Sequence, residues 1–305
     1  MKSYLVILAV VLLGFFSSCT KKDDKNETIL VKKNPLSKTE NTESRPDQKN
    51  DLNKAYQTAI REDKDSLKNK MFLDLSFRYL KSKDSIMFLK VNKQARDIAI
   101  SLKDSIGTAG TYWDLAQFYH TNNREDSAYY YYDKAHKIYE GLDDDLNSGS
   151  LLLNMAIIQK NIRDYTGSEV TTTNAITLLK PLDKFKLLYQ ANNNLGIVSN
   201  ELEEYDKAIF YYEKGIEYIQ KSRANRYLPS IWNNLGLVYH NQGNYTKAIE
   251  YFRKALSFDE NIENSDPKLY AMLIDNEANA KLHLGDTMGI YKQFVKALQI
   301  RKDID

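Results

Sequence analysis

The chain has 305 residues, with 43 Lys and Arg against 41 Asp and Glu and a formal net charge of +2. So small a charge on a chain of this length gives no support for a nucleic-acid-binding surface. The single cysteine excludes an internal disulfide, so the fold has to be stable through its apolar core alone.

The segment 1–18 has the pattern of an export signal. Lys2 is followed by an apolar run from Tyr4 to Phe16, and two serines then precede Cys19. A basic start, a short apolar core and small residues before a break are typical of a signal peptide, and the run is short for a membrane span. Ser-Ser-Cys resembles the lipobox of bacterial lipoproteins, although Phe16 stands where Leu is commoner. The resemblance implies cleavage before Cys19 and lipid attachment to its thiol; the alternative is ordinary secretion with an incidental free cysteine.

Residues 19–50 are expected to form a flexible tether after the lipidated cysteine. The segment is rich in Lys, Asp, Asn, Thr, Ser and Glu, so it cannot bury enough apolar surface to offset its ordering entropy. The run from Thr20 to Asp24 resembles the surface-export signal of Bacteroidota lipoproteins; the alternative is a plain hydrophilic spacer. We therefore expect a lipid-anchored protein of the cell envelope, in the outer membrane, which is either surface-exposed or periplasm-facing.

Residues 51–66 are expected to form a single helix. Apolar residues recur there at helical spacing, at Leu52, Ala55, Tyr56, Ala59 and Ile60. We expect this helix to cap the first of the repeats that follow.

The remainder, residues 67–305, repeats with a period of 40. Leu235 has apolar counterparts at Leu195, Met155, Leu115 and Leu75. A small residue follows each of them, and a second small column occupies Ala255, Gly215, Ala175, Ala135 and Ala95. Small residues at such positions let two helices approach closely. Repetition at this period predicts a solenoid of stacked helical hairpins.

The segment 229–262 shows the repeat most clearly. Its characteristic residues resemble the tetratricopeptide repeat (TPR) consensus, at Trp232, Leu235, Gly236, Tyr239, Gly243, Tyr245, Ala248, Phe252 and Ala255. The resemblance implies an all-α, right-handed TPR superhelix of about six hairpins, with a period of about 40 instead of the usual ~34. We expect units near 69–102, 109–142, 149–182, 189–222, 229–262 and 271–304. Phe88 in place of a small residue and Glu277 in place of Leu mark the first and last units as caps.

The sequence offers no constellation for catalysis. The four histidines, His120, His136, His240 and His283, have no metal-ligand spacing on one helix face. The chain also lacks a Gly-rich phosphate loop and a serine-elbow motif. We therefore expect no enzyme activity, no cofactor and no bound metal.

A polar residue precedes the Leu position in each repeat. The column consists of Asp74, Asp114, Asn154, Asn194, Asn234 and, after a two-residue slip, Asn276. Equivalent residues of a solenoid share one face, and we expect this column on the concave wall. The amide of Asn offers both a donor and an acceptor for a peptide backbone, and the column resembles the asparagine ladder of peptide-binding TPR proteins. The alternative is that these residues only cap local structure. Flanking concave positions are expected at Trp113, Gln117, His120, Lys160, Asn161, Asn193, Asn200, Asn233, His240, Asn241 and Asn279.

Together these patterns predict a non-enzymatic scaffold that binds a protein or peptide partner in its concave groove. The alternative is a sensory or regulatory TPR protein that signals through a separate kinase or transcription regulator. The sequence holds no second apolar span and no basic recognition helix, so that signal would have to pass through the separate partner.

Overall fold

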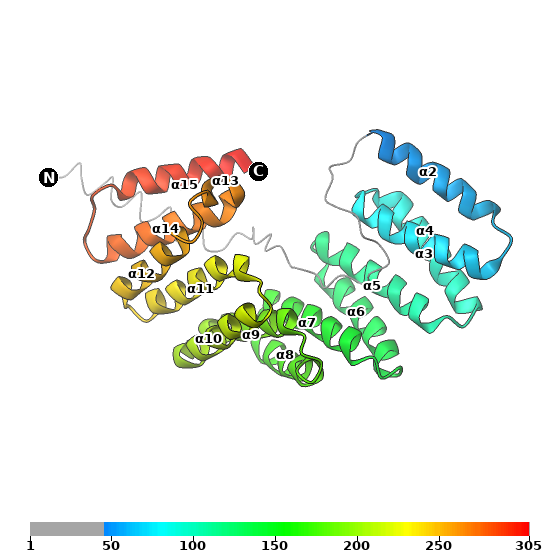
Figure 1. Cartoon of the computed structure of the whole chain (residues 1–305), viewed down its shortest axis with the longest axis horizontal. Coiled ribbons are helices and arrows are strands. Elements are labelled where there is room, and N and C mark those ends of the chain that lie inside the picture. The colour runs from blue at the N-terminus through cyan, green and yellow to red at the C-terminus, as the bar shows by residue number, and fades with distance from the viewer. Residues whose placement is uncertain (1–45, 305) are drawn as a thin grey trace. The chain divides into compact units, whose positions relative to one another are not determined.

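The structure, a computed structural model, describes residues 46–304, which belong to one compact unit, Lys33–Asp305. The expected signal peptide, the lipidation at Cys19 and nearly all of the tether lie outside the described residues. Within the described range, a single helix is followed by six helical hairpins and no strand, as Figure 1 shows. None of these described helices is both long and apolar enough to cross a bilayer.

The hairpins follow one another in chain order. The single helix is α2 (Pro46–Arg61), and the hairpins are α3 (Asp65–Lys81) with α4 (Ser85–Ser101), α5 (Ser105–Thr121) with α6 (Glu125–Glu140), α7 (Asp145–Asn161) with α8 (Tyr165–Leu179), α9 (Phe185–Glu201) with α10 (Tyr205–Lys221), α11 (Leu228–Asn241) with α12 (Tyr245–Leu256), and α14 (Pro267–His283) with α15 (Ile290–Ile304). Two short pieces, η1 (Asn225–Tyr227) and α13 (Ile262–Ser265), lie in the longer connections.

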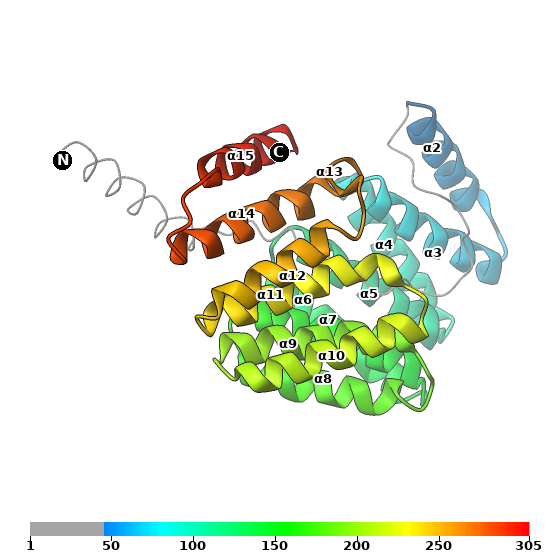
Figure 2. The same cartoon turned by 60° about the vertical axis from the view of Figure 1, so that its left-hand side comes forward.

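Stacking of neighbouring hairpins builds the core. The two helices of each hairpin pack on each other, and the second helix packs on the first helix of the next hairpin, as α6 does on α7 and α8 on α9. Figure 2 shows this succession from α7 through α12. The predicted all-α TPR-like solenoid of about six hairpins is therefore confirmed.

Small residues bring the two helices of a hairpin into close contact. A Cβ atom added to Gly196 on α9 would lie 2.6 Å from the ring of Tyr212 on α10. Gly236 on α11 meets the ring of Phe252 on α12 in the same way. The small column that follows the Leu position therefore marks a real helix crossing, where a large aromatic ring fills the space that the missing side chain leaves. Gly215 of the second small column instead lies against Ile231 of the next hairpin.

The turns between α3 and α12 are of one type, both within hairpins and between them. They occur twice in each period of the repeat. One residue in each of these turns has a positive φ between +50° and +78°, from Lys83 and Lys103 through Arg223 to Gly243. In the turn after α4, the backbone N–H of Lys103 donates to Ile100 O at 3.0 Å and the N–H of Asp104 donates to Ala99 O at 2.8 Å. This is the pair of hydrogen bonds of a Schellman C-cap. Asp104 then caps α5, because its Oδ1 accepts from the N–H of Gly107 at 2.8 Å.

The single N-terminal helix is displaced from its expected place. We expected residues 51–66, whereas α2 spans Pro46–Arg61 and Lys64 already precedes α3. Proline is well suited to the first turn of a helix, since its missing N–H would have no helical partner there. Leu52 and Tyr56 bury their side chains in the cluster that also holds Phe72 of α3, so the helix does pack on the first hairpin.

Glu277, which replaces the expected Leu in the last hairpin, is buried but fully paired. It is 5% exposed, and its Oε1 accepts from Arg253 Nε at 2.7 Å and from Lys281 Nζ at 2.9 Å. Gln293 of α15 donates to its other oxygen at 3.2 Å. Burial alone would raise the pKa of Glu277, but the hydrogen bonds from Lys281 and Arg253 hold this pKa below its ordinary value. The carboxylate therefore ties α12, α14 and α15 together.

Candidate peptide-binding surface

The first helices of successive hairpins form one layer. Direct contacts link α7 to α9, α9 to α11 and α11 to α14. In Figure 1, α7 and α9 lie on the side of the stack that is turned toward the middle of the picture, and α8 and α10 lie on the opposite side. Side chains that leave this layer away from the second helices are therefore the candidates for contact with a partner.

Three members of the predicted polar column do not reach that surface. Asp114, Asn154 and Asn194 are only 2%, 2% and 4% exposed. The Nδ2 of Asn194 donates to Ser168 Oγ and to Thr172 Oγ1, both at 2.9 Å, and both hydroxyls belong to α8 of the preceding hairpin. These three positions lie between hairpins, so the expectation of a continuous concave ladder through them is corrected.

Asp114 belongs to a buried polar network. The hydroxyl of Ser76 donates to Asp114 Oδ2 at 3.1 Å. The Nδ2 of Asn92 in turn donates to Ser76 Oγ and to the backbone oxygen of Thr111, both at 3.0 Å. Asn92 stands at the repeat position that is aromatic in four other repeats, at Tyr132, Tyr212, Phe252 and, after the two-residue slip, Phe294. The network satisfies its polar group in the core.

Asn234 and Asn276 behave differently, since both are half-buried. The Nδ2 of Asn234 on α11 donates to Asn193 Oδ1 on α9 at 2.9 Å. The Nδ2 of Asn276 on α14 donates to Asn233 Oδ1 on α11, also at 2.9 Å. Two amide pairs therefore join three consecutive first helices.

The preceding hairpin offers Asn194 and Asn234 different partners, although Asn154 is buried after a hairpin that, like the one before Asn234, has an alanine and a tyrosine at these places, Ala128 and Tyr132. Asn194 follows a hairpin that presents the hydroxyls of Ser168 and Thr172. The hairpin before Asn234 has Ala208 and Tyr212 at the equivalent positions, both buried. Without hydroxyl partners of that kind, the side chain of Asn234 instead reaches across to the neighbouring first helix.

An apolar strip runs beside these amides. Ile157, Ile197 and Leu237 hold equivalent positions on α7, α9 and α11, and all three are half-buried. Leu237 lies three residues after Asn234, so both occupy the same face of α11. The layer of first helices thus carries amide groups and partly exposed aliphatic side chains side by side.

His240 marks one edge of the layer. It is half-buried, and its ring lies 5.2 Å from the rings of both Tyr245 and His283, while Tyr245 and His283 stack at 4.5 Å. Burial, with a smaller contribution from the charge of His283, lowers the pKa of His240. The sequence did not reveal this proximity, because the last hairpin departs from the regular spacing of the others.

Some of the other predicted flanking positions are partly exposed, and others are buried. Gln117 on α5 is half-buried, and Asn241 donates to Asn200 Oδ1 at 3.2 Å along the edge that His240 marks. Trp113, which was expected on the concave wall, is 2% exposed and packs against Tyr139 with ring centroids 6.2 Å apart. The large indole fills the space between α5 and α6, so that expectation is corrected.

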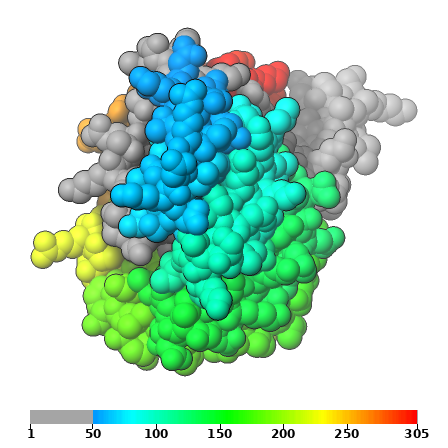
Figure 3. Space-filling view, turned by 90° about the vertical axis from the view of Figure 1, so that its right-hand side faces the viewer, coloured from blue at the N-terminus to red at the C-terminus, as the bar shows by residue number. Residues whose placement is uncertain are grey.

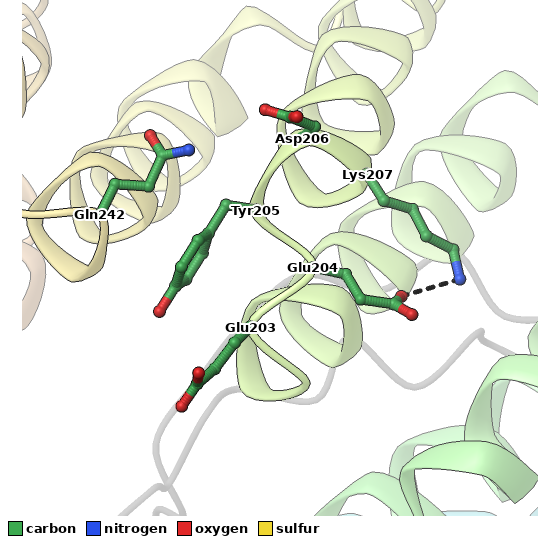
Figure 4. A pocket seen from close by; sticks show the side chains of 6 residues that line it. All are labelled: Glu203, Glu204, Tyr205, Asp206, Lys207 and Gln242. Atoms are coloured by element: carbon green, nitrogen blue, oxygen red, sulfur yellow. Dashed lines mark hydrogen bonds and ion pairs between the residues drawn. The ribbon is translucent and has the colours of Figure 1, made fainter.

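A separate hollow lies at the turn before α10, shown in Figure 4. None of the predicted site residues lines it. The lining residues, half of them acidic, are Glu203, Glu204, Tyr205, Asp206, Lys207 and Gln242. Lys207 bonds Glu169 at 2.6 Å and Glu204 at 2.9 Å, and these hydrogen bonds raise its pKa. The basic group is therefore already engaged by carboxylates of its own chain.

These features define the class of protein, a scaffold of stacked helical hairpins whose first helices form a continuous surface. Residues 189–222 and 229–262 each match a model of the tetratricopeptide repeat. Among curated proteins, no sequence match to the chain is found.

Solved structures show the same fold at low sequence identity. The apo form of RapI superposes with a TM-score of 0.59 at 17% identity, covering 77% of this chain and 98% of that one. The Rap conjugation gene regulator of plasmid pLS20, solved with the Phr* peptide, gives 0.60 at 16% identity, with 85% and 76% covered. A STAND protein with a TPR sensor, PH0952 from Pyrococcus horikoshii, gives 0.68 at 17% identity and 83% coverage of this chain. This chain spans only 39% of that last protein, and at these identities the likeness shows the fold alone.

Proposed function

We propose that this chain is a protein-binding scaffold that holds an extended peptide segment against α9, α11 and α14. One observation carries the proposal: two amide pairs, Asn193 with Asn234 and Asn233 with Asn276, bridge three adjacent first helices. Three of these residues are half-exposed, whereas Asn233 is only 1% exposed, so the expectation that Asn233 itself contacts a peptide is corrected. This surface contains the part of the expected asparagine ladder that solvent can reach.

The paired amides retain hydrogen-bonding capacity for a ligand. The bond between Asn234 and Asn193 uses one N–H of the first and one lone pair of the second. Each side-chain amide has two N–H donors and two oxygen lone pairs. Asn234 therefore keeps a donor and its acceptor, and Asn193 keeps both donors, in fixed positions that favour binding.

The spacing of the helices fits a peptide backbone. Packed helices lie about 8–10 Å apart, and an extended chain advances about 3.3 Å per residue. One amide pair would therefore meet the peptide about every third residue. The strip of Ile157, Ile197 and Leu237 beside the amides favours aliphatic side chains at intervening positions.

We further propose that the scaffold acts at the cell envelope, held there through lipid on Cys19. The basis is the sequence alone, with its apolar run from Tyr4 to Phe16 and the Ser-Ser-Cys motif. Metabolic labelling with a clickable palmitate analogue tests this proposal. Wild-type protein should be labelled and Cys19→Ala should not, whereas equal labelling of both would refute lipidation at this residue.

Selection from a phage-displayed library of random peptides, using residues 33–305 as bait, tests the binding surface. The affinity of a selected peptide is then measured by fluorescence polarisation. Asn193→Ala with Asn234→Ala should weaken it by roughly tenfold or more, because each lost hydrogen bond is worth about 1 kcal/mol.

The matched control is Asn174→Ala, since Asn174 is exposed on α8, a second helix. This variant should bind the peptide as the wild type does. Unchanged affinity in the double variant, with thermal stability retained, would refute a role of the amide pairs. Failure to select any peptide that competes for this surface would refute the scaffold function itself.

A further inference from the structure

A basic cluster lies where the hairpin of α9 and α10 leads into α11, three helices that Figure 2 shows side by side. The cluster consists of five exposed cations from the start of α9, the end of α10 and the connection through η1: Lys184, Lys186, Lys221, Arg223 and Arg226. The same segments, 183–186 and 217–227, contain only two carboxylates, those of Asp183 and Glu217. The cluster therefore keeps a net positive charge.

No carboxylate of the described residues forms an ion pair with any of these five cations. Glu217 is engaged by Lys214 instead, at 3.0 Å. Other exposed cations of the chain do find acids, as Lys296 does with Glu263 at 2.8 Å. The charge of the basic cluster is therefore left for a ligand to neutralise.

Aromatic rings hold two of the cations in place without neutralising them. Lys186 Nζ lies 5.7 Å from the centroid of the Tyr227 ring, and Arg226 Cζ lies 5.0 Å from the same centroid. Tyr227 is itself fixed, because it stacks on the buried Tyr189 with centroids 5.2 Å apart. Cations that cation–π contacts already orient lose less freedom when they bind an anion.

The hydroxyl of Tyr227 shows that the cluster favours negative charge. Arg226 Nη2 donates to Tyr227 Oη at 3.0 Å. Burial alone would raise the pKa of Tyr227, but the hydrogen bonds and charges of Arg226 and Lys186 lower this pKa from its ordinary value of 10.0. An oxygen anion is therefore stabilised at this place.

Acidic residues border the cluster on both sides. The equivalent connection one hairpin earlier carries Asp143, Asp144 and Asp145 around the start of α7, and the next connection carries Asp259 and Glu260. Equivalent connections of a solenoid lie along one edge. A broad anionic surface such as a membrane would be repelled by these carboxylates, whereas a short acidic segment fits between them.

The cluster also shares a helix face with the amide pairs. Lys186 precedes Asn193 by seven residues, or two turns of α9, so both lie on one face about 10 Å apart along the axis. An extended chain covers that distance with about three residues. A partner held at Asn193 and Asn234 is therefore long enough to reach the cluster.

We propose that the basic cluster binds an acidic segment of the protein partner, a run of Asp or Glu side chains about three or more residues from the part held by the amide pairs. The carboxylates accept from Lys186 and Arg226, with the other cations of the cluster around them. This inference rests on the proposed scaffold function for the existence of the partner, and it adds the charge that the partner carries.

Fluorescence polarisation of a fluorescein-labelled hexaglutamate peptide with residues 33–305 tests the cluster directly. The peptide should bind at low salt and more weakly as salt screens the charges, and hexaglutamine should not bind. Lys186→Glu with Arg226→Glu should weaken binding by roughly tenfold or more, because two attractive contacts become repulsive. The matched control, Lys54→Glu with Lys70→Glu, reverses two exposed charges on α2 and α3 and should bind as the wild type does. Figure 3 shows the end of the stack where α2, in blue, forms the surface.

Two further variants separate this proposal from folding defects and from the amide layer. Lys184→Glu with Arg223→Glu changes the cluster outside the Tyr227 contacts and should also weaken hexaglutamate binding. Asn193→Ala with Asn234→Ala should leave it unchanged, so failure of the amide layer and failure of the basic cluster are separate results. Three glutamates added to one end of a phage-selected peptide, after a Gly-Ser-Gly spacer, should tighten its binding several-fold in the wild type only.

Four outcomes would overturn the proposal. Hexaglutamate might as well bind nowhere if no polarisation change occurs at low salt, and an equal loss in the cluster and control variants would show a non-specific charge effect. Binding of phosphatidylglycerol vesicles that depends on Lys186 and Arg226 would assign the cluster to a membrane surface. Full displacement of hexaglutamate by millimolar inorganic phosphate would assign it to a small anion.

Discussion

The turn after α4 holds a lysine in a backbone conformation that glycine adopts more easily. Lys103 has φ +57° in a turn between two hairpins, and Arg163 and Glu203 have φ +66° and +61° in turns within hairpins. The left-handed helical region costs a residue with a side chain roughly 1–2 kcal/mol, whereas glycine enters it freely but loses more entropy on folding. We therefore expect Lys103→Gly to stabilise the fold by about 1 kcal/mol.

The structure allows this magnitude to be tested in both directions. The three turns are well separated, so their effects should add to about 3 kcal/mol in the triple variant. Gly243 has φ +78° in the corresponding turn after α11, and Gly243→Ala should lose about what Lys103→Gly gains. Urea unfolding followed by far-ultraviolet circular dichroism measures the shift in midpoint. A lower midpoint for Lys103→Gly, or an unchanged one for Gly243→Ala, would contradict the reasoning.

Three further predictions follow from individual contacts. Lys184 precedes α9 without a side-chain cap, so Lys184→Asp should add about 1 kcal/mol of stability in urea unfolding, and no gain would count against the cap argument. A Cβ at position 196 would lie 2.6 Å from the Tyr212 ring, so Gly196→Ala should lower the melting temperature through overpacking worth about 1–3 kcal/mol; an unchanged melting temperature would refute the close crossing. Because the pKa of Glu277 is lowered in the fold from its ordinary value of 4.5, its stabilisation should be complete above that pH and disappear as the pH falls through the lowered pKa. Glu277→Gln should remove this acid dependence and, by removing the ion pair of the mostly buried Lys281, cost about 2 kcal/mol at neutral pH. A pH profile identical to that of the wild type would refute the assignment.

The repeated apolar and small residues were sufficient to predict the fold. Leu195 and Leu235 are both nearly inaccessible, and the glycines that follow them do lie against aromatic rings. Such positions are constrained by packing on all sides, so residue type and spacing determine where they lie. The regular period of these positions was therefore enough to predict most of the fold.

The direction of polar side chains could not be predicted in the same way. Asn194 and Asn234 hold equivalent places in the repeat, yet Asn194 is buried and Asn234 is half-exposed. Asn194 donates to hydroxyl groups of the preceding hairpin, such as that of Thr172, which lies 22 residues before it in the sequence, and Asn234 donates to Asn193 of a neighbouring first helix. The direction of each side chain depends on which residues of the neighbouring hairpin it contacts. The sequence pattern shows only which residues hold equivalent positions in the repeats, so it could not predict these contacts.

The uniform length of the units limits how such a chain can change in length. From α3 to α10, the positive-φ residues recur at one constant interval, from Lys83 and Lys103 to Arg223. Removing one helix together with its turn would exchange the roles of first and second helices in everything downstream and turn core faces outward. Removing a whole hairpin, such as the segment 149–188, would join the start of one first helix to the rest of the next first helix. Every remaining contact between hairpins would then still pair a second helix with a first helix. Insertions and deletions in this region should therefore be tolerated only as whole hairpins, which would lengthen or shorten the layer of first helices by one step.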